Sequence, residues 1–239
     1  MARLRLRLIQ IIRASSRNLA TFSVLLCLVM IAPTAQAQTL YSIATSGRFA
    51  TLSIEIRIPL TPKWAHDVVL NATIAWNQAR IWYQREVHAG PAYRFIESNK
   101  PNVTVSFTIP SLESGFARGW TSYNFAHGSV VIASAQIYLD QKIFSADQEH
   151  NSTDRRVAFR IALHELGHVL GLGEMFDGRD VMDPRGNLDA TAPLISTLDL
   201  YTIQLLASSL SVPAFVNLPS NITDQTIDAY SLLAGYTTK

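Results

Sequence analysis

The sequence predicts a single α+β (α/β-like) domain in which a twisted mixed β-sheet packs against helices. Its 239 residues are 48% hydrophobic and 16% charged, a composition typical of a packed globular chain. Segments with strand or helix periodicity follow in the order strand, helix, several strands, helix, loop and helix. This order suits one sheet with helices against it, followed by a smaller C-terminal part.

The first 37 residues differ from the rest and predict a signal peptide. Five arginines and no acidic residue precede an apolar run from Leu19 to Ala32, and small residues precede a cleavage site after Ala37. The run is shorter than the roughly 20 residues of a membrane span, and an uncleaved membrane anchor is the alternative. We expect a secreted protein with a domain at 38–212 and an unassigned tail at 213–239.

Cysteine content and charge exclude several classes of site. Cys27, the single cysteine, lies in the leader, so the mature chain has no disulfide, zinc–thiolate site or cysteine nucleophile. Without the leader the chain carries 15 basic and 18 acidic residues, and nothing indicates nucleic-acid binding. Four sequons permit glycosylation outside the cytoplasm, at Asn71, Asn102, Asn151 and Asn221.

The first half of the domain has strand patterns around one long helix. Residues 51–60 alternate apolar and polar side chains, as a half-buried strand does. Apolar residues then recur at helical spacing from Pro62 to Glu86. Further strand patterns follow, at residues 93–96, 103–109, 116–125 and 129–140.

Two shorter helices follow the strands. After a polar loop at 141–153, a helix is predicted over residues 154–170, and Gly171 suits the left-handed turn that ends it. A stretch rich in glycine and proline comes next. The last clear helix begins at Ser196, where Asp199 completes a capping box.

The stretch from residue 164 to residue 174, H-E-L-G-H-V-L-G-L-G-E, carries the chemistry. His164 and His168 are four residues apart on the predicted helix, so both imidazoles project from one face and can reach one metal ion. Glu165 lies beside them, where it can hold the water that a metal activates. The spacing therefore predicts a zinc site with a carboxylate next to it.

A catalytic zinc ion takes three protein ligands, so a third must come from outside this helix face. Gly171 permits the chain to turn back, and Glu174 follows three residues later. A carboxylate is a legitimate zinc ligand, and we expect Glu174 to be the third one. Asp177 and Asp180 are nearby rivals.

His164-Glu165-x-x-His168-x-x-Gly171-x-x-Glu174 resembles the zinc-binding signature of the metzincin metallopeptidases, and its flanking residues are similar to those of matrixins. The segment Val181-Met182-Asp183-Pro184 resembles the methionine turn of that family, and the helix from Ser196 is similar to the matrixin C-terminal helix. Metzincins usually have histidine, and some have aspartate, at the position of Glu174. The resemblance spans residues 45–210 and is strong between 157 and 206.

The resemblance implies a metzincin-type zincin fold, with a long N-terminal helix, an active-site helix and a small C-terminal subdomain that contains the methionine turn and the final helix. It implies a Zn²⁺ cofactor bound by the two histidines and Glu174, with Glu165 as the catalytic general base. It also implies that Met182 forms an apolar floor and that residues 116–123 form an edge strand which pairs with an extended peptide substrate.

The sequence therefore predicts a secreted zinc endopeptidase whose partner is a protein or peptide in extended conformation. The alternative is a catalytically silent binding protein on a metzincin scaffold, a hypothesis motivated by Glu174. A zinc hydrolase that acts on a non-peptide amide is the third hypothesis.

Overall fold

A computed structural model of the chain describes residues 42–87, 90–108, 118–145, 148, 152–175, 180–184 and 193–234. The chain divides into two compact units, Met1–Leu40 and Tyr41–Lys239, and the predicted signal peptide lies outside the described residues. Among the helices of the described residues, none is long and apolar enough to span a bilayer.

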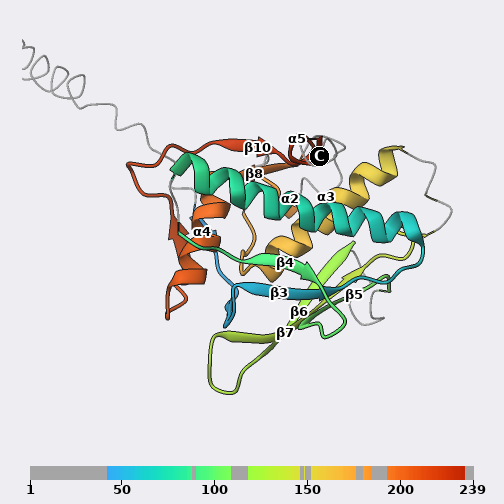
Figure 1. The fold of residues 1–239 in the computed structure, drawn as a ribbon, viewed down its shortest axis with the longest axis horizontal. Helices are drawn as coiled ribbons and strands as arrows, with labels where there is room; N and C mark the ends of the chain where they lie inside the picture. The colour runs from blue at the N-terminus through green and yellow to red at the C-terminus, as the bar shows by residue number, and fades with distance from the viewer. Residues whose placement is uncertain are drawn as a thin grey trace, which may run out of the picture. The chain divides into compact units, whose positions relative to one another are not determined.

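The second unit contains a six-stranded, mostly parallel sheet (Figure 1). Its order is β2-β7-β5-β3-β4, all paired in parallel, and β6 pairs antiparallel with β7. Within the described strands β6 pairs with β7 alone, so its second edge is open to another strand. The strand bounds are β2 Arg48–Phe49, β3 Ser53–Arg57, β4 Arg94–Glu97, β5 Val103–Ser106, β6 Gly119–Phe125 and β7 Val131–Leu139.

Two long helices, α2 (Lys63–Val87) and α3 (Ser152–Val169), lie on the same face of this sheet (Figure 1). They form because apolar residues recur at helical spacing, and the recurring side chains of α2 are buried, among them Trp64, Val68, Ala72, Ala75, Ala79 and Tyr83. Strand residues alternate instead, so that Ile54 and Ile56 of β3 face the helices and are buried.

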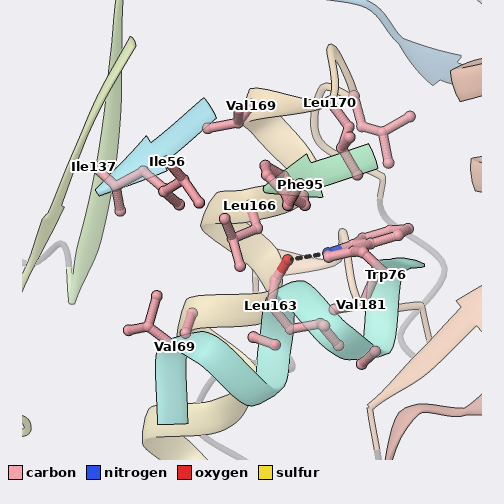
Figure 2. Packing of buried hydrophobic residues seen from close by; sticks show 14 of the residues in the cluster. Ile56, Val69, Trp76, Phe95, Ile137, Leu163, Leu166, Val169, Leu170 and Val181 are labelled. Carbon is pink, nitrogen blue, oxygen red and sulfur yellow. Dashed lines mark hydrogen bonds between the residues drawn. The ribbon is translucent and has the colours of Figure 1, made fainter. Parts of the chain in front are cut away.

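The core lies between these layers, with α3 packed on both α2 and the sheet (Figure 2). Leu166 and Val169 of α3 point into it, toward Val69 of α2 and Ile137 of β7. The indole Nε1 of Trp76 in α2 donates a hydrogen bond to the main-chain oxygen of Leu163 at 2.9 Å (Figure 2). This buried bond fixes α3 against α2 at the residue that precedes His164.

The helix α4 (Thr197–Ser208) begins with the predicted capping box. The Ser196 hydroxyl accepts from the Asp199 amide at 3.1 Å, and the Asp199 Oδ2 accepts from the Ser196 amide at 3.0 Å. Asp199 is fully buried, and this burial, together with the neighbouring charge of Asp180, raises the pKa of its carboxyl group well above the usual value.

The tail from residue 213 to residue 239, which the sequence left unassigned, contributes three elements within its described part. Strand β9 (Phe215–Asn217) pairs antiparallel with β1 (Ser42–Ala44), and β10 (Thr226–Asp228) pairs antiparallel with β8 (Leu194–Ser196). Helix α5 (Ala229–Ala234) packs on α2, and the Tyr230 ring stacks on Phe159 of α3 at a centroid distance of 4.8 Å. The tail therefore connects the N-terminal strand to both long helices.

The structure confirms a mixed sheet with helices against it, in the predicted order. The helix predicted over 62–86 is α2, that over 154–170 is α3, and that from Ser196 is α4. Strands β3, β5 and β7 are shorter than the predicted ranges, and β4 has the predicted length but begins one residue later. Residues 109–117, which include the start of the strand predicted at 116–125, lie outside the described part of the chain.

The capping box predicts a measurable contribution to stability. Replacing Ser196→Ala leaves a helix amide without its acceptor and is expected to lower the free energy of unfolding by about 1 kcal/mol. Urea unfolding of the purified protein measures this change. Ser208→Ala, at the exposed far end of the same helix, is the matched control and should unfold as the wild type does. Equal urea midpoints for the two variants would contradict the assignment.

Candidate metal centre

Helix α3 carries His164 and His168 one turn apart near its C-terminal end. Their rings are neighbours, with centroids 4.6 Å apart and planes inclined at 82°. The His164 side chain is 3% exposed and that of His168 is 16% exposed, so both are largely shielded from water. The four-residue spacing thus brings both imidazoles to one place, as the sequence predicted.

Each imidazole is oriented by a main-chain carbonyl group. The Nδ1 atom of His164 lies 2.9 Å from the oxygen of Val181, and the Nδ1 atom of His168 lies 2.9 Å from the oxygen of Leu172. A carbonyl oxygen only accepts hydrogen bonds, so Nδ1 carries the proton in both rings. This tautomer leaves the Nε2 lone pairs to bind a metal, in the way that metal-binding histidines are usually held.

Glu174 completes the group. Its Oε2 lies 3.6 Å from Nε2 of His164, and its Oε1 lies 3.6 Å from Nε2 of His168. The ligand atoms of the three residues all lie within 4.8 Å of one another, the one such group among the described residues. Of the rival ligands, Asp180 is buried and accepts from the Met182 amide at 2.7 Å, and Asp177 lies outside the described residues.

The charges of this group favour a cation. Burial of the Glu174 carboxyl group opposes its ionisation, but protonation of the two imidazoles at Nε2 would outweigh burial and lower its pKa to about 2. Burial likewise disfavours the charged form of His168, yet the carboxylates of Glu174 and Glu165 favour a proton on this ring and leave its pKa raised. The three side chains therefore stabilise positive charge between them, which a bound metal ion would supply.

The turn that delivers Glu174 depends on glycine. Gly171 has a φ of +96°, in the left-handed region that glycine favours, and a Cβ atom there would collide with the Gly47 oxygen and with Leu206. The Ser46 amide donates to the Gly171 oxygen at 2.9 Å, and Thr45 forms a bridge with Leu172. The N-terminal segment thus supports the turn from outside.

Met182 lies buried against α3. Its sulfur occupies the space that a Cβ atom on Gly167 would need, so only glycine at 167 admits this packing. The preceding residue, Val181, donates its amide to the Leu194 oxygen at 2.8 Å and offers its own oxygen to His164. The turn that contains Met182 is therefore fixed to both α3 and β8.

Glu165 lies in the same cleft as the three ligands. The cleft has a volume of about 760 Å³, and Glu165 is only 4% exposed within it. Strand β6 forms one wall of the cleft, which is lined by Ser46, Arg118, Gly119, Trp120, Thr121, Tyr123, Ile161, His164, Glu165, His168, Gly173, Glu174 and Pro184.

Three contacts at this wall were not predicted from the sequence. Thr121 donates from Oγ1 to the Glu165 Oε2 at 2.7 Å, and Gly119 lies directly against the same carboxylate. Tyr123 donates from its hydroxyl group to the His168 oxygen at 2.9 Å, and burial raises the pKa of this phenol. The sequence indicated an edge strand here, but no pattern in it shows which side chains face α3.

The arrangement is suited to hydrolytic metal chemistry. Two imidazole nitrogens and one carboxylate oxygen form a ligand set for a borderline divalent cation, and a second carboxylate stands beside them in an open cleft. A metal in such a set activates water, and a nearby carboxylate accepts the proton.

No protein-family model matches the chain, and no curated protein sequence does. One solved structure that is similar, described as the GM1 bound form of the ECX AB5 holotoxin, shares 9% sequence identity with a TM-score of 0.39. The similarity covers 70% of this chain and 88% of that one.

Proposed function

We propose that this protein is a secreted, zinc-dependent endopeptidase of the metzincin type, with a matrixin-like catalytic domain. The observation that carries the proposal is the convergence of His164, His168 and Glu174 beside the Glu165 carboxylate. The export leader predicted over residues 1–37 supports secretion.

The residues of the triad fit zinc. Catalytic zinc takes three protein ligands from nitrogen and oxygen donors and keeps one position open, and here both histidines present Nε2 in the required tautomer. When bound, zinc would supply Lewis-acid polarisation of a carbonyl group and a lowered pKa for water. Glu174 would take the place that histidine usually has in metzincins.

The residues of the cleft account for the chemistry of peptide hydrolysis. Glu165 lines the same cleft as the ligand group, where it would accept the proton of the attacking water and pass it to the leaving amine. Strand β6 offers its open edge to a substrate in extended conformation through main-chain hydrogen bonds. An open cleft beside an edge strand suits cleavage within a chain.

One contact and the geometry of two neighbouring segments support the methionine-turn assignment. Met182 is buried against Gly167 on the helix that carries both histidines, which supports a role as an apolar floor. The positive φ of Gly171 supports the turn that the metzincin signature requires. The helix α4 and its capping box support a small C-terminal subdomain after that turn.

Metal titration tests the ligand set directly. Calorimetry on metal-free protein should show a single zinc ion per chain. His164→Ala and Glu174→Ala should each weaken zinc binding by more than the roughly 10- to 100-fold that follows loss of a group outside the ligand set.

The matched control for Glu174→Ala is Glu97→Ala. Glu97 is also half-exposed, at 46% against 41%, and also lies near a histidine, at 3.3 Å from Nε2 of His66. Its variant should bind zinc as the wild type does. Equal zinc affinity for Glu174→Ala and the wild type would remove Glu174 from the ligand set.

Cleavage of casein, gelatin and a broad peptide library tests the activity. The zinc-loaded wild type should cleave peptide bonds, a chelator should abolish the cleavage, and Glu165→Ala should reduce it by about 100-fold or more, since it removes the general base. A zinc-loaded wild type that cleaves no peptide would leave the silent binding protein, or a hydrolase of non-peptide amides, in its place.

A further inference from the structure

The Glu165 carboxylate is held by the edge strand β6. Thr121 Oγ1 lies 2.7 Å from the Glu165 Oε2, and both side chains are nearly excluded from solvent, at 9% and 4% exposure. A hydroxyl group has one proton to donate, and a short bond to a carboxylate is about twice as strong as a neutral one. The main-chain oxygen of Glu165 is a more distant acceptor, at 3.2 Å.

Gly119 completes this contact from the same face of the strand. Residues two apart in a strand point to the same side, so positions 119 and 121 both face α3. A Cβ atom at Gly119 would stand 2.5 Å from the Glu165 Oε1 and 2.7 Å from its Cγ. Because Gly119 has no side chain, the Glu165 carboxylate has room to lie against the strand, and Thr121 binds one of the two carboxylate oxygens.

We propose that Thr121 is a positioning residue for the general base: its hydroxyl group holds Oε2 of Glu165 and leaves Oε1 to take the proton of the attacking water. This inference rests on the proposed function of Glu165. Without the hydroxyl group, the carboxylate loses its one side-chain hydrogen bond among the described residues and can turn away from the reacting atoms.

The same strand then orients both partners of the reaction. Strand β6 pairs with β7 in one register from Gly119 opposite Leu139 to Asn124 opposite Ser134, and the register shifts only before Phe125, so the part of the strand that holds Glu165 is fixed to the sheet. Its open edge is the place for the peptide main chain, and its inner face holds the base. The same strand therefore positions both the base and the peptide bond. A small displacement of one relative to the other would lower the rate of hydrolysis strongly.

Kinetics of zinc-loaded variants test the positioning role. Thr121→Val keeps the shape of the side chain and removes the hydroxyl group. It should lower kcat by about tenfold or more and change KM by less than about threefold, because the base is misplaced while the peptide edge is intact. Thr121→Ser restores the hydroxyl group and should recover most of kcat. Thr104→Val, the same substitution on β5 at a residue outside the cleft, is the matched control and should keep the wild-type kcat.

Urea unfolding of metal-free protein tests the contact without any need for activity. Thr121→Val should lower the urea midpoint in the wild-type background and change it little in the Glu165→Ala background, whereas Thr104→Val should have the same effect in both. Additive effects of the Thr121 and Glu165 changes, or a kcat for Thr121→Val within twofold of wild type, would overturn the inference. If the wild type cleaves nothing, the proposed function fails, and the unfolding cycle still decides whether Thr121 holds Glu165.

Discussion

Two hydrogen bonds, from the Nδ1 atoms of His164 and His168 to main-chain carbonyl groups, hold the chain after α3 against that helix. One acceptor, Leu172, belongs to the turn opened by Gly171, and the other, Val181, belongs to the turn that contains Met182. The N-terminal segment holds the first of these turns, and β8 holds the second. The orientation of the two imidazoles therefore depends on the path of the loops, and each bond is lost if either of its partners moves.

The rigidity of the centre comes from the core beneath it. Buried residues of α3 pack on α2 and the sheet, and the bond from Trp76 to Leu163 fixes the helix one residue before His164. Gly167 lets the Met182 sulfur approach the helix backbone more closely than any larger residue would allow. Dense packing at this helix therefore limits how far the His164 and His168 side chains can move.

The sequence was informative wherever the signal is local. Periodicity located the long helices and most strands, spacing placed both histidines on one face, and Gly171 marked the turn. It could rank Glu174 above its rivals, but convergence on the histidines depends on the path of a loop. The contact of Thr121 with Glu165 joins residues 44 positions apart, which no local pattern indicates. The main-chain oxygen of Leu172 accepts a hydrogen bond whatever its side chain is, so the sequence does not identify it as an acceptor. The strands of the tail have three residues each and its helix has six, too few to show a period.

The pairing of β1 with β9 has a consequence for the order of folding. Thr45 both bridges Leu172, beside the ligand turn, and donates from its hydroxyl group to the oxygen of Pro213, 168 positions along the chain. Contacts of such sequence separation form late, because a long loop must close before they contribute. While the chain is being synthesised, the segment around Thr45 has no β9 to pair with. The turn at Gly171 thus gains its full support only after the C-terminal residues have been added.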